Sequence, residues 1–313
     1  MKCIIFGGGG FIGSAIVDRL LQDGHSVRIF ERPRVEPYRK FNKREQVEWI
    51  TGDFLSTHDV IRAIDGGDVV FHLVSTTLPK SSNDDPIYDV QSNVVGALQL
   101  FNAMVVCKIP KIIFISSGGT VYGIPKYLPI DEQHPTEPLV SYGITKLTIE
   151  KYLHLYERMH DIKTITLRVA NPYGERQRIE TAQGAVGVFL HRALTKMPIE
   201  IWGDGSVTRD YIHISDVVDA FTRAMEYAGQ KSVFNIGSGT GTSLNELVFM
   251  LEDVLGRSVK HNYLPARPFD VPVSVLNNNL AREELHWTPT TSMQDGIKRT
   301  TEWMKGELAK VQR

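Results

Sequence analysis

The chain has 313 residues, 42% of them hydrophobic, which is enough to bury a large core as one domain or as two lobes. Its formal net charge of −1 does not favour binding to nucleic acid or to an anionic membrane, and we expect neither partner. Cys3 and Cys107 are the only cysteines, so neither a disulfide framework nor a metal site is indicated. Without a charged leader or an apolar run of about 20 residues, the chain is expected to be cytoplasmic.

Strand and helix patterns alternate through the first half of the chain. In chain order they are assigned to residues 2–6, 12–23, 26–30, 47–50, 57–64, 68–73, 86–106, 111–116, 141–159 and 163–169. The alternation predicts an α/β fold, with a Rossmann-type doubly wound parallel sheet and a smaller C-terminal substrate-binding lobe. Patterns at 216–227 and 233–236 indicate a helix and a strand that return to the sheet. The expected domains are 1–170 plus about 208–236 for the sheet, and 171–207 with 237–313 for the lobe.

The glycine run Gly7–Gly13 separates the first strand from the first helix. Glycines let the backbone approach a pyrophosphate, and the start of the helix offers free N–H donors, so a phosphate site is predicted. Glu31 ends the second strand, where a carboxylate holds a ribose 2′-hydroxyl and favours NAD over NADP. Arg32 and Arg34 leave a 2′-phosphate open as the alternative.

The spacing Tyr-x-x-x-Lys places both side chains on one helical face, so that the lysine ammonium lowers the pKa of the phenol. The chain contains this spacing three times, at Tyr122/Lys126, Tyr142/Lys146 and Tyr227/Lys231. Pro125 interrupts the first pair and Gly229 weakens the third, whereas helix formers follow Tyr142. We therefore expect Tyr142 and Lys146 to be the catalytic pair.

Ser116 and Ser117 end the strand pattern that precedes this helix. Ligands bind beyond the carboxyl ends of parallel strands, so a hydroxyl here can reach the reacting oxygen or the tyrosine. The alternative is a pair of turn serines before Gly118 and Gly119.

These residues resemble the extended short-chain dehydrogenase/reductase family, and within it the nucleotide-sugar epimerases, nearly end to end. Besides the glycine run and the Tyr142/Lys146 pair, the resemblance is carried by the segments 52–54, 71–73, 93–96, 116–123, 167–174, 209–213 and 267–270. It implies an NAD site made by Gly7, Gly10, Phe11, Ile12, Gly13, Glu31, Arg32, Asp53, Phe54, Leu73, Asn93, Ser116, Tyr142 and Lys146. It also implies a nucleotide-sugar site made by Ser117, Asn171, Trp202, Arg209, Arg267, Asp270 and Ser274.

The chain departs from the family pattern at Gly118, where counting back from Val121 places the usual catalytic hydroxyl. Counting back from Tyr142 places it at Ser117, which we assign, with Thr120 as the weaker candidate. Gly118 and Gly119 also replace the Asp-Glu pair of the family's 4,6-dehydratases. Without that acid and base, dehydration of the hexose is not expected.

The resemblance implies 4-epimerisation of a UDP-hexose, either UDP-glucose/galactose or UDP-GlcNAc/GalNAc, through a transient 4-keto sugar. Ser274 stands where members restricted to plain hexoses carry a bulky tyrosine, which leaves room for an N-acetyl group. The alternatives are an NAD(P)H-dependent 4-keto-sugar reductase and a non-catalytic NAD(H)-binding regulatory protein. The nucleotide base stays open among uracil, thymine and guanine. Family members commonly form homodimers through the two long helices, here 86–106 and 141–159.

Overall fold

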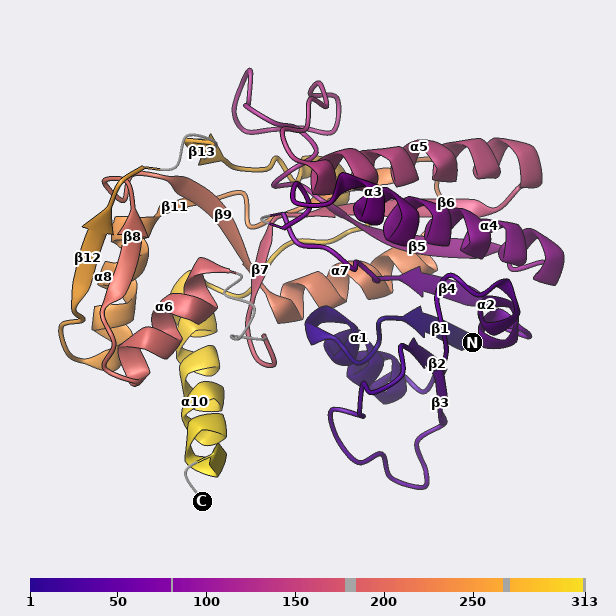
Figure 1. Cartoon of the computed structure of the whole chain (residues 1–313), viewed down its shortest axis with the longest axis horizontal. Helices are drawn as coiled ribbons and strands as arrows, with labels where there is room; N and C mark the ends of the chain where they lie inside the picture. Colours follow the sequence, from indigo (N-terminus) through magenta and orange to yellow (C-terminus); the bar gives the residue numbers. More distant parts are fainter. Residues whose placement is uncertain (80, 178–183, 267–270, 312–313) are drawn as a thin grey trace.

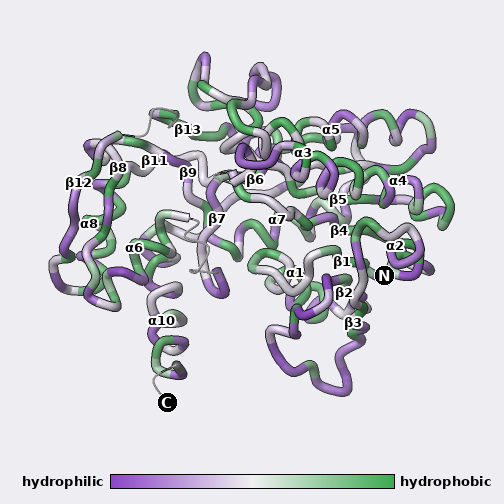
Figure 2. Tube along the Cα trace, viewed as in Figure 1, coloured by the Kyte–Doolittle hydropathy of each residue, from purple (hydrophilic) through white to green (hydrophobic). Residues whose placement is uncertain are grey.

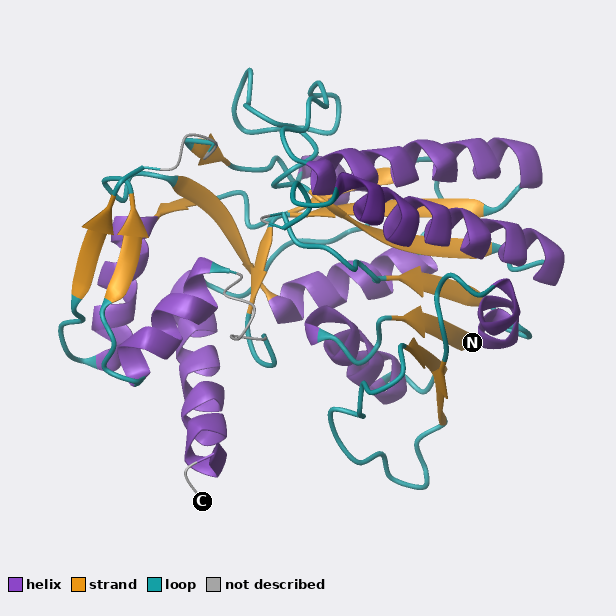
Figure 3. Cartoon of the chain, in the orientation of Figure 1, coloured by secondary structure: helices purple, strands orange, loops and turns teal. Residues whose placement is uncertain are grey.

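A seven-stranded sheet forms the larger part of the molecule (Figures 1 and 3). The computed structural model describes residues 1–79, 81–177, 184–266 and 271–311. The strand order is β10-β6-β5-β4-β1-β2-β3, and every neighbouring pair is parallel. The strands are β1 (Lys2–Phe6), β2 (Ser26–Glu31), β3 (Val47–Thr51), β4 (Val69–His72), β5 (Lys111–Ser117), β6 (Lys163–Val169) and β10 (Val233–Ile236). This confirms the predicted doubly wound parallel sheet.

Helices cover both faces of this sheet because its strands carry apolar side chains on both sides. One face packs against α1 (Phe11–Gln22) and α7 (Ile214–Glu226). The other packs against α2 (Thr57–Ile64), α4 (Gly96–Cys107) and α5 (Ser141–His160) (Figure 1). The order of the strands reverses between β1 and β4, and in folds of this kind ligands bind at that switch point, beyond the carboxyl ends of the strands.

The segment expected as one helix over 86–106 has three parts: α3 (Pro86–Asp89), a π-helical turn η1 (Val90–Val95) and α4. A side chain accounts for the widened turn locally, because Asn93 Nδ2 donates to the backbone carbonyl of Asp89 at 3.1 Å. By length and composition alone, Pro86–Cys107 is also long and apolar enough to cross a membrane, contrary to the expectation that no such run exists. Half of its most apolar window is buried, and core helices pass the same test.

The lobe is built from short strands and four helices among the described residues. A four-stranded sheet joins β11 (Gly241–Ser243), β9 (Thr208–His213) and β13 (Val273–Ser274), with β7 (Asn171–Tyr173) also on β9. A second sheet pairs β8 (Ile199–Trp202) with β12 (His261–Leu264). The helices are α6 (Ala185–Leu194), α8 (Leu244–Leu255) and α10 (Met293–Val311), together with α9 (Asn279–Glu284), which packs against the core of the large sheet beside β10. Side chains of α6, α8 and α10 pack together in a separate core, and Figure 2 shows apolar segments along these helices.

The chain returns to the large sheet after the first part of the lobe. Strand β10 pairs with β6, and α7 packs on the sheet, as the sequence patterns at 216–227 and 233–236 indicate. Residues 208–213, expected with the large sheet, form β9 of the four-stranded sheet instead. The exact division into two domains stays a prediction.

Candidate active site

The glycine loop after β1 closes tightly on itself. Gly7 has φ of +88°, and its carbonyl accepts a hydrogen bond from the Gly10 N–H at 3.1 Å. A Cβ at Gly13 would lie 2.1 Å from the Gly7 oxygen, so this close approach requires glycine. Helix α1 begins at Phe11 with no side-chain cap and no acid in its first turn. Phe11 and Ile12 are the first two residues of the helix. This helix start fits a pyrophosphate, because uncapped N–H groups and the helix dipole favour an anion.

Glu31 lies beside the glycine loop. Its Oε1 accepts a hydrogen bond from the Gly9 N–H at 2.8 Å, so the carboxylate is held against the glycine loop. Arg32 and Arg34 are exposed in the following loop. This geometry suits the recognition of a ribose hydroxyl by Glu31.

Asp53, Phe54 and Leu73 lie at the same edge of the sheet. Asp53 follows β3 and accepts a hydrogen bond from the Leu55 N–H at 2.9 Å. The ring of Phe54 packs 5.6 Å from that of Phe6, and the Leu73 N–H donates to the Phe6 carbonyl at 3.0 Å. The structure thus brings these three residues, which the resemblance places in the NAD site, to the end of β1 that carries the glycine loop.

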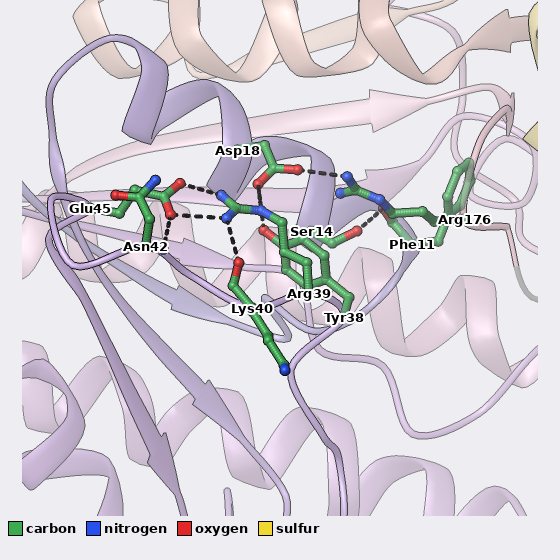
Figure 4. Close-up of polar contacts among 9 residues, drawn as sticks. All are labelled: Phe11, Ser14, Asp18, Tyr38, Arg39, Lys40, Asn42, Glu45 and Arg176. Atoms are coloured by element: carbon green, nitrogen blue, oxygen red, sulfur yellow. Dashed lines mark hydrogen bonds and ion pairs between the residues drawn. The ribbon is translucent and has the colours of Figure 1, made fainter.

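Asp18 on α1 anchors the loop that follows β2 (Figure 4). Its Oδ1 accepts hydrogen bonds from Tyr38 at 2.9 Å and Arg39 at 2.8 Å, and Arg39 also donates to Glu45. Its Oδ2 accepts from Arg176 at 2.7 Å, a residue that follows β7. Helix α1, which follows the glycine loop, is therefore hydrogen-bonded to the segment that enters the lobe.

Tyr142 and Lys146 lie in the first two turns of α5. Of the three Tyr-x-x-x-Lys pairs, only this one lies within a helix. Lys146 is buried; its Nζ lies 5.6 Å from the centroid of the Tyr142 ring and donates to the Ile115 carbonyl at 3.0 Å. The pair is therefore fixed against the end of β5, close to the two serines.

The electrostatics of this pair differ from our expectation. Burial and the charge of Asp89 raise the pKa of Tyr142 to about 12, while a hydrogen bond with Ser75 acts in the opposite direction. Burial lowers the pKa of Lys146 to about 8, and the charges of Glu150 and Asp89 oppose that shift. The expected lowering of the tyrosine pKa by Lys146 is thus not present in the chain alone, because desolvation of the phenol dominates.

Ser116 and Ser117 point to different surroundings. Ser116 is 3% exposed and its hydroxyl donates to Glu150, which also forms a bidentate ion pair with Arg168. Arg168 in turn donates to the Tyr122 hydroxyl at 2.9 Å. The Ser116 side chain therefore serves a buried network in this structure, and we had not expected that role.

Ser117 is partly exposed, and its hydroxyl has no hydrogen-bond partner within the described part of the chain. The Thr120 hydroxyl is buried, also without a partner among those residues. At Gly118, a Cβ would lie 2.5 Å from Leu276 Cδ1 and 3.1 Å from the Arg168 carbonyl, so a side chain is excluded unless Leu276 moves. Of these two candidate hydroxyls, that of Ser117 is therefore the more accessible, while the exposed Ser75 is the serine whose side chain bonds Tyr142.

The side-chain amide of Asn93 is hydrogen-bonded within the protein and is therefore not free to bind a ligand. It is 6% exposed, its Oδ1 accepts from the Thr76 N–H at 3.0 Å, and its Nδ2 donates to Thr77 and Asp89. Asn93 therefore holds the loop after β4, where a cofactor site of this fold lies.

The expected nucleotide-sugar residues lie on the lobe side. Asn171 begins β7 and donates to the Asp210 carbonyl at 2.9 Å. Arg209 and the buried Ser274 are register partners on β9 and β13, and Trp202 ends β8 with 36% of its surface exposed. Arg267 and Asp270 lie outside the described residues.

Sequence reasoning missed three groups near the catalytic helix: Asp89, Glu150 and Arg168. All three are charged and at most 6% exposed. A carboxylate within a run of acids, or one on a long amphipathic helix, is usually on the surface, so sequence alone did not single them out. The available signals were the i,i+4 spacing of Asp89 and Asn93 and the position of Arg168 in the segment 167–174 that carries the resemblance.

Comparisons with known proteins agree with this geometry. Residues 3–237 match the NAD dependent epimerase/dehydratase family. A UDP-glucose 4-epimerase of Mycolicibacterium smegmatis is 36% identical over 98% of this chain and 99% of its own. A dTDP-4-dehydro-6-deoxyglucose reductase of Escherichia coli is 34% identical over 94% of this chain and 94% of its own. The crystal structure of a UDP-glucose 4-epimerase with UDP-glucose from Thermotoga maritima has a TM-score of 0.93 and 34% identity, over 98% of this chain and 100% of that one. The chain belongs to the NAD dependent epimerase/dehydratase family.

Proposed function

We propose that this protein is an NAD-dependent 4-epimerase of a UDP-hexose. The observation that carries the proposal is the placement of Tyr142 and Lys146, beside the end of β5 and within the fold of UDP-sugar epimerases. The reactive tyrosine is thus next to the sheet edge that carries the glycine loop and Glu31.

Residues on both sides of the switch point fit a dinucleotide. The Gly7–Gly13 loop and the start of α1 would hold the pyrophosphate, and Glu31 the adenosine ribose. Asp53, Phe54 and Leu73 would surround the adenine, and Lys146 the second ribose. When bound, NAD accepts the C4 hydrogen of the sugar as hydride and returns it, and its cationic nicotinamide favours an ionised phenol nearby.

The tyrosine performs the proton chemistry. Tyr142 takes the proton of the sugar 4-hydroxyl while the C4–H bond breaks, which leaves a 4-keto sugar. After the keto sugar rotates within the site, hydrogen returns to the opposite face of C4 and Tyr142 returns the proton to the oxygen. Both electrons and the proton are restored, so the reaction inverts C4 with no net oxidation. Ser117 would donate a hydrogen bond to the reacting oxygen.

The reductase alternative uses the same residues and has a relative in its favour. A reductase releases oxidised cofactor in every cycle, whereas an epimerase keeps it bound. Purified protein that carries bound cofactor and epimerises UDP-glucose with no added cofactor supports the epimerase. Oxidation of added NADPH by a 4-keto sugar nucleotide, without any epimerisation, would assign the reductase. A Tyr142→Phe variant that keeps its full activity in the cell would instead indicate the regulatory alternative.

The lobe would hold the nucleoside diphosphate. We assign Asn171, Arg209, Arg267 and Asp270 to the diphosphate and ribose, and Trp202 to the base. Ser274 lies in register with Arg209, and at that position a small side chain would leave room for an N-acetyl group where a tyrosine would not. We therefore propose that UDP-GlcNAc and UDP-GalNAc are accepted together with the plain hexoses.

We further propose a homodimer formed through α4 and α5. These helices contact each other, with the Tyr156 hydroxyl donating to Asn102 at 2.6 Å. Their outer sides leave large apolar side chains exposed, including Val106 at 70% and Met159 at 63%. Light scattering should give twice the chain mass, and a monomer mass would overturn the assignment. The free thiols of Cys3 and Cys107 fit the proposed cytoplasmic location.

A further inference from the structure

A buried carboxylate accepts a hydrogen bond from the residue that precedes Tyr142 in the chain. Asp89 ends α3 and is 0% exposed. Its Oδ2 accepts a hydrogen bond from the Ser141 hydroxyl at 2.6 Å, and Ser141 immediately precedes Tyr142. Its Oδ1 accepts from Thr77 at 2.5 Å and from Asn93 at 2.8 Å. Among the described residues, no cation lies within ion-pair distance of this carboxylate.

The segment that carries Asp89 also holds the first turn of α5. This helix has no side-chain cap from its own N-cap residue, Val140. Instead, the Ser141 N–H donates to Asn83 Oδ1 at 2.9 Å, and the Tyr142 N–H donates to Ser82 Oγ at 3.0 Å. Side chains from outside the helix thus satisfy two of its open donors, and the negative carboxylate sits at the positive end of the helix dipole.

We propose that Asp89 is a positioning residue for the epimerase reaction: through Ser141 it fixes the turn that carries Tyr142, and its charge sets the pH range in which Tyr142 and Lys146 act together. This inference rests on the proposed function. It assigns to the segment 82–89 a role in catalysis, although none of its side chains needs to touch the sugar.

The charged groups around Tyr142 and Lys146 determine in which direction Asp89 shifts their pKa values. The groups that face it are Asp89 at the end of α3, Glu150 on α5 and His72 on β4. His72 is neutral, because burial and then the charge of Lys146 lower its pKa to about 3. Asp89 raises the pKa of Tyr142, and together with Glu150 it opposes the lowering of the Lys146 pKa. Removing the charge of Asp89 therefore lowers both pKa values.

The pH profile of turnover tests this role. In the NAD-bound protein, where the cationic nicotinamide favours the ionised phenol, the acid limb reports ionisation of Tyr142 and the basic limb reports loss of the Lys146 ammonium. In Asp89→Asn, both limbs should move to lower pH by about one unit, because a nearby charge is removed. Asp84→Asn, an exposed acid on the same segment, should leave both limbs in place. A purely structural Asp89 would reduce kcat without moving either limb, and that result would overturn the proposal.

Two further measurements keep the test independent of folding defects and of turnover. Ser141→Ala keeps the charge and removes one contact, so kcat should fall about tenfold with KM unchanged, and neither limb should move to lower pH. Unchanged kcat in Ser141→Ala would refute the positioning part. Tyrosinate absorbance of the NAD-saturated protein, with Tyr142→Phe as the blank, should begin at lower pH in Asp89→Asn. Because this titration needs no substrate, it can fail or succeed whether or not the protein is an epimerase.

Discussion

The buried ion pair between Glu150 and Arg168 should be the most sensitive electrostatic element of the sheet domain. The two side chains are 4% and 6% exposed, and their closest contact is 2.6 Å. Glu150 also accepts from Ser116, so the pair joins α5 to β5 and β6 behind the site. Glu150→Gln keeps the size of the side chain but leaves the Arg168 charge buried without a counter-charge. Breaking a buried pair in this way costs about 3–5 kcal/mol of the free energy of unfolding.

A matched substitution on the surface provides the control. Glu137 pairs with Lys126 at 2.7 Å, but these side chains are 62% and 55% exposed. Glu137→Gln should therefore leave the stability nearly unchanged, because solvent screens the pair. Glu150→Gln/Arg168→Met removes both buried charges, and it should regain part of the loss seen in Glu150→Gln.

Urea unfolding followed by far-UV circular dichroism measures these differences. All variants must be compared at one protein concentration and one NAD concentration, since association and cofactor binding both shift the apparent stability. A Glu150→Gln variant within about 1 kcal/mol of the unsubstituted protein would refute the reasoning, because it would mean that Arg168 is solvated or is paired elsewhere.

Three further substitutions test the site itself. Gly13→Ala forces the new Cβ against the Gly7 carbonyl, so copurified NAD should be lost; full cofactor content in the purified variant would contradict the assigned phosphate loop. Tyr142→Phe should lower kcat by about 10²–10⁴-fold with an unchanged circular dichroism spectrum, and turnover near the normal rate would exclude Tyr142 as the base. Ser274→Tyr should reduce kcat/KM for UDP-GlcNAc by at least about tenfold and spare UDP-glucose; an equal loss for both sugars would place Ser274 away from the N-acetyl position.

Much of the sheet domain follows from local patterns. Apolar runs and glycine turns predicted β1, β5 and β6 within a residue of their ends, because buried parallel strands are read directly from apolar runs. The helix formers after Tyr142 likewise located α5. The π-helical turn at Val90–Val95 could not be predicted, since it depends on the contact of Asn93 with Asp89.

The positions of the candidate site residues in the fold follow from the sequence better than their electrostatics do. Sequence motifs identified Tyr142, Lys146 and Glu31, whose roles depend on their strand and helix positions. The resemblance places Ser116 in the cofactor site, and only the fold shows that its hydroxyl is bonded to Glu150. The pKa of Tyr142 depends on its burial and on Asp89, 53 positions earlier in the chain, and neither is visible in a local pattern.

One measurement tests the central claim most directly. Purified protein, with no added cofactor, is incubated separately with UDP-glucose and UDP-GlcNAc, and the 4-epimer is sought by NMR. We predict conversion of both sugars to an equilibrium mixture, with bound NAD retained throughout. No conversion of either sugar by protein that retains NAD would contradict the assignment as a UDP-hexose 4-epimerase.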